Sequence, residues 1–164
     1  MEILYILLGS LFLVFMVWGI VDEINKKKKR LEREHRIKQS GIYEVDRMTG
    51  EMFEEYLQFL FTAIGYQAHM TSTSGDYGAD LILTAPSKII VVQAKRYKNK
   101  VGLKAVQEIV SAKRHYGADE CWVITNNYFT APAKNLGFSN DVLLIERDQL
   151  VDLMMEVNMG EQLV

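Results

Sequence analysis

Residues 3–21 contain no charged side chain, and this run constrains what the chain can fold into more than any other feature of the sequence. A helix rises about 1.5 Å per residue, so a helix over this run would span roughly 28 Å, close to the hydrocarbon thickness of a bilayer. A cleaved signal peptide carries positive charge before its apolar run, whereas Glu2 precedes this run and Asp22 and Glu23 follow it. The run therefore predicts a single transmembrane helix over residues 3–21.

Basic residues gather directly after the predicted span. Lys26, Lys27, Lys28, Lys29 and Arg30 follow one another, and the positive-inside rule places such a cluster on the cytoplasmic side. Residues 22–46 then form a charged juxtamembrane linker that either lies against anionic lipid headgroups or is a solvated helix, and both interpretations stay open. We expect a single-pass protein of the cell membrane whose C-terminal domain is cytoplasmic.

The rest of the 164-residue chain has room for one domain with one hydrophobic core. Residues 42–164 carry a net charge of −5, yet residues 88–114 contain eight Lys and Arg side chains and a single acid, Glu108. Only this basic stretch suits a polyanionic partner. The one cysteine, Cys121, excludes an intramolecular disulfide and a zinc site of the CxxC type.

Apolar periodicity and turn residues predict alternating helices and strands in this domain. Helices are expected over 52–64 (capped by Asp46 or Thr49), 103–116, 130–136 and after a cap at Asp148, and strands over 66–70, 81–84, 89–95, 121–125 and 142–145. The strand, helix and strand over 89–125 imply a right-handed crossover and parallel pairing. The predicted fold class is α/β, with a mixed β-sheet flanked by helices over residues 47–157 and a short tail over 158–164.

The strands at 81–84 and 89–95 bring three polar side chains together. If residues 85–88 form a hairpin loop, Thr84 pairs with Ile89, and Asp80 falls opposite Gln93. Gln93 and Lys95 are two residues apart on one strand, so both share the face on which Asp80 lies. A carboxylate, an amide oxygen and an ammonium therefore converge at the strand ends. An edge strand with polar ends has the same pattern, and the spacing alone leaves both interpretations open.

Five short motifs occur in the order typical of one nuclease family. They are Gly50-x-x-Phe53-Glu54, Gly65-Tyr66, Asp76-Tyr77-Gly78-Ala79-Asp80, Val92-Gln93-Ala94-Lys95-Arg96-Tyr97 and Phe129-Thr130-x-x-Ala133. With these motifs the chain resembles the Mrr-type (type IV) restriction endonuclease domain of the PD-(D/E)xK nuclease superfamily. The resemblance covers about residues 47–153 and implies a restriction-endonuclease-like fold.

The resemblance also implies a Mg²⁺-dependent endodeoxyribonuclease, with Mn²⁺ as an alternative metal. Asp80 would be the metal-binding aspartate, and Lys95 would orient or deprotonate the attacking water or neutralise phosphate charge. Gln93 stands where many superfamily members carry Glu, as it does in Mrr-like domains, and its neutral amide offers a hard cation less than a carboxylate does. Glu54 borders the apolar stripe of the first helix, so it is the acid best placed to act as a further metal ligand, unless it is an ordinary solvated glutamate.

Basic residues continue past the predicted catalytic strand. We expect Arg96, Lys98, Lys100 and Lys104 to contact DNA phosphates, although a solvated loop has the same composition. The leading hypothesis is a membrane-anchored, metal-dependent DNA endonuclease, with homo-oligomerisation left open. The alternative hypothesis is an inactive nuclease-fold module that tethers DNA or a protein partner to the membrane, because Gln93 and the net negative charge of the domain weaken the case for cleavage.

Overall fold

The computed structural model describes residues 2–38, 41–71 and 77–161, and it divides into two compact units, Met1–Ile37 and Lys38–Val164. The first unit is one helix, α1 (Glu2–Lys38). No helix in the described part of the chain is long and apolar enough to cross a bilayer, so the transmembrane helix predicted over 3–21 is not found there. Residues 3–12 of that predicted span lie outside the residues whose side chains are described.

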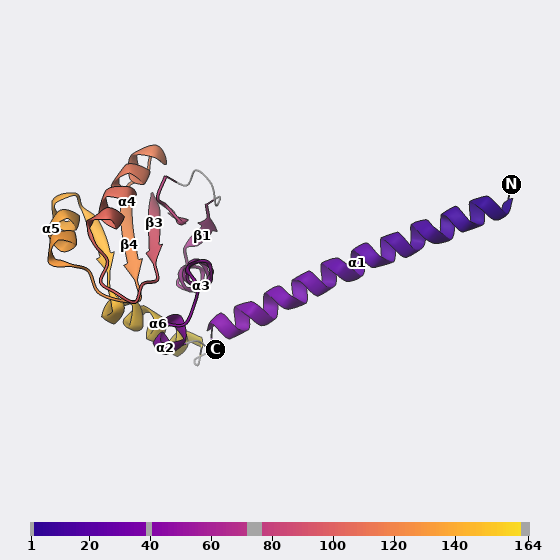
Figure 1. Ribbon diagram of the computed structural model, residues 1–164, viewed down its shortest axis with the longest axis horizontal. Helices are drawn as coiled ribbons and strands as arrows, with labels where there is room; N and C mark the ends of the chain where they lie inside the picture. The colour runs from indigo at the N-terminus through magenta and orange to yellow at the C-terminus, as the bar shows by residue number, and fades with distance from the viewer. Residues whose placement is uncertain (1, 39–40, 72–76, 162–164) are drawn as a thin grey trace. The chain divides into compact units, whose positions relative to one another are not determined.

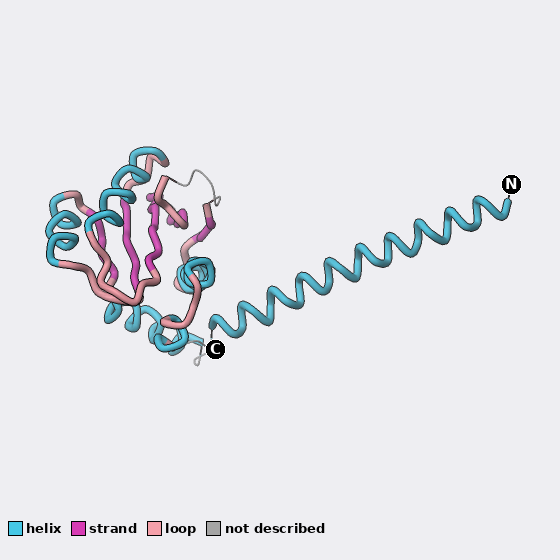
Figure 2. Tube along the Cα trace, viewed as in Figure 1, coloured by secondary structure: helices cyan, strands magenta, loops and turns pink. Residues whose placement is uncertain are grey.

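The second unit contains a five-stranded sheet with helices on both faces (Figures 1 and 2). Its elements are α2 (Ile42–Val45), α3 (Gly50–Ala63), β1 (Gln67–Met70), β2 (Leu81–Ala85), β3 (Lys88–Lys95), α4 (Leu103–His115), β4 (Glu120–Thr125), α5 (Ala131–Ser139), β5 (Val142–Ile145) and α6 (Arg147–Glu161). The strands lie in the order β1-β2-β3-β4-β5. β2 pairs antiparallel with both β1 and β3, whereas β4 pairs parallel with both β3 and β5. The predicted α/β class with a mixed sheet and a parallel crossover is confirmed.

Local chemistry explains where these helices begin. Thr49 caps α3, because its side chain accepts a hydrogen bond from the Met52 amide at 3.2 Å. Of the two predicted caps, Asp46 and Thr49, the second is therefore confirmed. Asp148 is wrong as the cap of the last helix: α6 begins at Arg147, so Asp148 lies in its first turn, where a carboxylate favours the positive end of the helix dipole. The short helix α2 falls inside the predicted linker and is a further difference.

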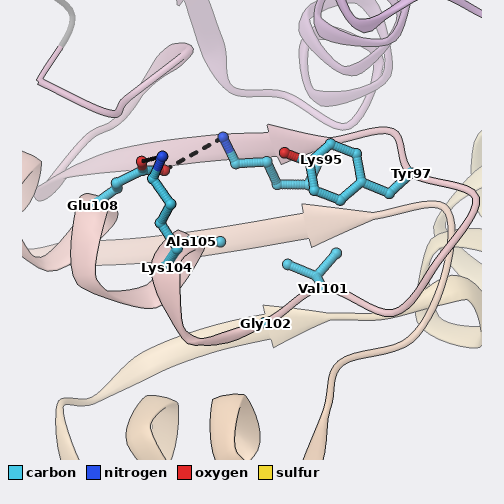
Figure 3. Close-up of a pocket in the computed structure, with 7 residues that line it drawn as sticks. All are labelled: Lys95, Tyr97, Val101, Gly102, Lys104, Ala105 and Glu108. Carbon is cyan, nitrogen blue, oxygen red and sulfur yellow. Dashed lines mark ion pairs between the residues drawn. The ribbon is translucent and has the colours of Figure 1, made fainter.

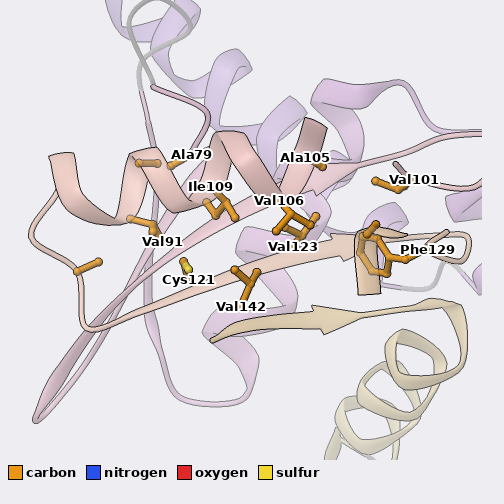
Figure 4. Close-up of a cluster of buried hydrophobic side chains, with 13 residues drawn as sticks. Ala79, Val91, Val101, Ala105, Val106, Ile109, Cys121, Val123, Phe129 and Val142 are labelled. Atoms are coloured by element: carbon orange, nitrogen blue, oxygen red, sulfur yellow. The ribbon is translucent and has the colours of Figure 1, made fainter. Parts of the chain in front are cut away.

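The two faces of the sheet are covered by different helices. Buried side chains of α4 and α5 form one cluster with alternate residues of the central strands, including Val91 and Val123 (Figure 4). On the other face the Phe61 ring of α3 lies 5.8 Å from the Trp122 ring, centroid to centroid. Because successive side chains of a strand point to opposite faces, Val91, Gln93 and Lys95 face α4, whereas Ile90, Val92 and Ala94 face the side that α3 covers.

An ion-pair network ties the start of the domain to its end. The Arg147 guanidinium of α6 donates to both carboxylate oxygens of Asp46, at 2.8 and 2.9 Å, and Asn126 at the end of β4 donates to the same carboxylate at 2.8 Å. The hydrogen bond from Arg147 is the main reason why the pKa of Asp46 lies below its ordinary value. Asn126 also accepts from the Tyr97 amide at 2.9 Å, so this network fixes the chain directly after β3.

Candidate active site

The β2–β3 hairpin has the predicted register. Thr84 pairs with Ile89 and Leu81 pairs with Val92, so Asp80, the residue before β2, lies opposite Gln93. The predicted loop at 85–88 is tighter than expected, because Ala85 and Lys88 also pair. The Asp80 amide donates to the Val92 carbonyl at 2.8 Å, which continues the ladder to the position of the aspartate.

The Asp80 carboxylate is anchored to the neighbouring strand. Its Oδ2 atom accepts a hydrogen bond from the Ala94 amide at 2.7 Å. A backbone donor of this kind positions a carboxylate without neutralising its charge. The Asp80 carboxylate is therefore held in place beside the end of β3 and can offer its negative charge to a ligand.

Lys95 lines a pocket of about 190 Å³ at the same end of the strand. The other lining residues are Tyr97, Val101, Gly102, Lys104, Ala105 and Glu108 (Figure 3). Gly102 is the N-cap of α4 and has no side chain that could satisfy the first amides of the helix. The pocket thus combines two lysines with the positive end of a helix, and this combination suits an anionic group.

Glu108 of α4 joins the predicted residues, although it was not predicted as a site residue from the sequence. Its Oε2 atom accepts a hydrogen bond from Gln93 Nε2 at 2.8 Å. The same atom lies 3.5 Å from Lys95 Nζ, and the Oε1 atom lies 3.5 Å from Lys104 Nζ (Figure 3). Burial alone would raise the pKa of Glu108, but the hydrogen bond from Gln93 and the charges of Lys95 and Lys104 outweigh it and lower the pKa. The site therefore contains a second carboxylate that stays ionised.

Two features of the sequence could have identified Glu108. It is the only acid among residues 88–114. It also follows Ala105 by three residues and precedes Ala112 by four, so it lies beside the buried stripe of α4. Its neighbour Gln107 is exposed.

The Gln93 amide has one partnered atom and one unpartnered atom. The residue is only 1% exposed, and its Oε1 atom accepts no hydrogen bond from any residue that the structure describes. A buried oxygen without a partner is costly and calls for an explanation. A hard cation supplies one, because Mg²⁺ binds carboxylate and amide oxygens such as those of Asp80 and Gln93. The residues present therefore fit a divalent metal.

Glu54 lies on α3, half-buried, on the helix that covers the opposite face from α4. Over the described residues, no cluster of three His, Cys, Asp or Glu side chains could hold a metal ion. Glu54 therefore does not join Asp80 and Glu108 in such a cluster, and its role as a further ligand stays a prediction. Asp76, the first residue of its motif, lies outside the described residues.

The predicted DNA-contacting residues fall into two groups. Lys98 and Lys100 are exposed in the loop after β3, and Lys104 is exposed beside the pocket. Arg96 points elsewhere: its Nη1 atom donates to the Asp46 carbonyl at 3.5 Å, and its Nε atom is buried. The structure brings Lys104 to the pocket but directs Arg96 toward α2. A role for each in DNA binding stays a prediction.

Comparison with known proteins assigns the domain. The Mrr_cat family model, described as a restriction endonuclease, matches residues 45–154. The chain therefore belongs to this restriction endonuclease family, and its second unit is a nuclease-class domain, as the resemblance in the motifs implied. No match is found among curated proteins.

Three solved structures match parts of this chain. The DNA modification-dependent restriction endonuclease AspBHI has a TM-score of 0.56 and 20% identity, over 79% of this chain and 36% of that one. The MspJI restriction endonuclease in complex with a 27-mer oligonucleotide has a TM-score of 0.49 and 20% identity, over 66% and 29%. The protein of unknown function AF1548 has a TM-score of 0.48 and 16% identity, over 56% and 54%. The chain thus spans only part of each protein, and the AspBHI likeness shows a shared fold.

Proposed function

We propose that this protein is a metal-dependent DNA endonuclease. The observation that carries the proposal is the buried, unpartnered Oε1 atom of Gln93, which lies opposite Asp80 and two residues before Lys95 in a domain of the restriction endonuclease family. DNA as substrate is supported by the class of the family and by the lysines around the pocket, since phosphate contacts hold a duplex without reading its sequence.

Hydrolysis of a phosphodiester joins the oxygen of a water molecule to phosphorus, breaks one P–O ester bond and transfers a proton to the departing oxygen. Asp80 and Gln93 would hold a Mg²⁺ or Mn²⁺ ion, which when bound polarises the phosphoryl group and acidifies water. Lys95 lines the pocket, and its ammonium would stabilise negative charge on the phosphoryl oxygens. Glu108 holds that ammonium at 3.5 Å.

The two ends of β3 offer matched controls for an activity assay. Asp119 accepts a hydrogen bond from the Ile89 amide at 2.8 Å, much as Asp80 does from Ala94, but at the opposite end of the strand. Lys88 forms an ion pair with Glu120 at 2.7 Å, in parallel with the pair at Lys95. Each catalytic substitution can therefore be compared with one that removes a similar contact far from the pocket.

The test uses purified full-length protein in detergent and supercoiled plasmid with Mg²⁺ or Mn²⁺. Asp80→Asn and Lys95→Met should abolish nicking, and chelation should abolish it in the parent protein, whereas Asp119→Asn and Lys88→Met should retain it. Clean nicking by Asp80→Asn would overturn the proposal. Retention of DNA binding without metal-dependent turnover would favour the non-cleaving tether instead.

We also propose that α1 anchors the domain at the cell membrane, with the domain in the cytoplasm. The support is the uncharged run over 3–21 and the basic cluster that follows it. The apolar side chains between Leu13 and Val21 on α1 are about half or more exposed within the unit, and a lipid environment would remove this apolar surface from water.

Fractionation tests this second proposal. The protein should sediment with membranes and resist extraction by high salt and alkali. A reporter that works only in the cytoplasm should be active when fused after Val164, and a reporter that works only outside the cytoplasm should be inactive there. Replacement of Phe15 and Val17 by Lys should release the protein, because a charged side chain on the apolar surface of α1 opposes its contact with lipid. Recovery of the parent protein in the soluble fraction would overturn the anchoring. The proposal includes contact of α1 with membrane lipid. Homo-oligomerisation stays a prediction, and light scattering after size-exclusion chromatography measures it.

A further inference from the structure

The amide of Gln93 can in principle take two orientations that exchange its oxygen and nitrogen. A carboxylate only accepts hydrogen bonds, whereas an amide nitrogen only donates. With Glu108 at 2.8 Å, the orientation that places Nε2 toward α4 is therefore selected. The consequence is that Oε1 is the amide atom that does not bind Glu108, and it is buried where none of the described residues donates to it.

Close packing holds Glu108 in place. A Cβ atom at Gly78 would lie 2.8 Å from Glu108 Cβ and 3.2 Å from the Glu108 carbonyl carbon and oxygen. Only glycine permits this approach, so the segment that leads to Asp80 and the α4 turn that carries Glu108 lie in direct contact. The backbone and Cβ atom of Glu108 are therefore held close to the segment that leads to Asp80.

The contacts of Glu108 also indicate how it acts. Its Oε2 atom is taken by Gln93 and lies near Lys95, and its Oε1 atom faces Lys104. Both oxygens are thus occupied by donors of this chain. Glu108 therefore acts on the site through these partners.

We propose that Glu108 is a positioning residue that presents Gln93 Oε1 as a metal ligand and places one negative charge behind it. The hydrogen bond from Nε2 to a carboxylate increases electron density on the amide oxygen, as carboxylates behind metal-binding histidines increase the basicity of the ring. The neutral Gln93 and the charged Glu108 together do the work that one glutamate would do. This inference rests on the proposed metal-dependent function.

A double-mutant cycle read out by metal binding tests the inference. Calorimetric titration of the full-length protein with Mn²⁺ compares the parent, Glu108→Gln, Gln93→Ala and the double variant. Glu108→Gln should weaken Mn²⁺ binding by about 10-fold or more, the usual effect of losing such a supporting carboxylate. In the Gln93→Ala background the same substitution should change the Mn²⁺ affinity by less than about 2-fold, because the Gln93 amide through which Glu108 acts is absent. Glu120→Gln, which loses a lysine-paired carboxylate away from the pocket, should leave affinity unchanged.

A second readout needs no metal. In the metal-free protein, the Nε2 protons of Gln93, assigned by their loss in Gln93→Ala, should exchange slowly with water, and Glu108→Gln should accelerate their exchange. Denaturation midpoints of the variants report any loss of folding separately.

The outcomes separate the two proposals. Absence of Mn²⁺ binding by the parent would overturn the metal-dependent function and this inference with it. Binding by the parent that Glu108→Gln does not weaken, or weakens equally in both backgrounds, would overturn only the role of Glu108. Fast exchange of the Gln93 Nε2 protons in the metal-free parent would also overturn only the role of Glu108.

Discussion

The contact between Gly78 and α4 allows a sharp prediction about stability. Gly78 has φ +91° and Gly65 has φ +97°, so alanine meets nearly the same backbone strain at both positions. The surroundings differ, because a Cβ at Gly65 meets nothing within 4 Å whereas a Cβ at Gly78 lies 2.8 Å from Glu108 Cβ. Gly65→Ala is therefore a matched control in which only the steric overlap is missing.

The expected magnitudes follow from these two terms. A positive φ costs a residue with a side chain roughly 1–2 kcal/mol, and overpacking against fixed neighbours costs about 1–3 kcal/mol more. Gly65→Ala should therefore lower the free energy of unfolding by about 1–2 kcal/mol, and Gly78→Ala by about 2–5 kcal/mol. Each kcal/mol corresponds to about 4 °C in Tm for a domain of this size.

Urea denaturation followed by circular dichroism measures both variants. Gly78→Ala should also reduce nuclease activity more than Gly65→Ala does at temperatures where both are folded, because the added methyl group forces Glu108 away from Gln93. Equal losses of stability in the two variants would refute the close approach of α4. If the two variants differed in stability but had equal nuclease activity, the contact between Gly78 and Glu108 would contribute to stability and not to activity.

Three further predictions concern charge and capping. The pKa of Asp46 is lowered by Arg147, so its stabilising contribution is present above the unfolded value near 3.8 and is lost as pH falls toward the folded pKa; Asp46→Asn should flatten this acid dependence in urea titrations. Neutralising Lys98 and Lys100 should lower the slope of log K against log[salt] by roughly two units for unrelated DNA sequences, and an unchanged slope would exclude them as phosphate contacts. Thr49→Ala should cost about 1 kcal/mol of stability through the α3 cap.

The hairpin was predictable from sequence because its determinants are local. The turn at Pro86 sets which residues pair, and the two-residue period of a strand then decides which side chains share a face. The confirmed pair of Thr84 with Ile89 places Asp80 opposite Gln93 without any knowledge of the rest of the chain. The same period could have separated Arg96 from Lys95, since neighbours on a strand face opposite sides, and the structure directs Arg96 toward α2.

Glu108 was harder to predict because its role depends on tertiary packing. Helical spacing places it beside the buried stripe of α4, but spacing does not say which strand residue it meets. That depends on tertiary contacts such as the close approach of Gly78 to Glu108, two residues that are 30 positions apart in the chain. For Glu54 the position on the helix predicted a role as a metal ligand, and no contact in the structure tests that role.

The two ends of β3 show which features distinguish a site from ordinary structure. Each end has a lysine paired with a carboxylate, Lys88 with Glu120 and Lys95 with Glu108. The first pair is shorter, at 2.7 Å against 3.5 Å, so a strong ion pair is not what marks the functional end. The carboxylate of Glu108 is instead shared with Gln93, whose other amide atom is buried without a donor among the described residues. A fold that needed only stability would let Lys95 close on Glu108 and would place an apolar side chain at position 93, because a buried amide with one unpartnered atom is costly. The longer ion pair and the open oxygen are the two features that the proposed metal-dependent function would explain.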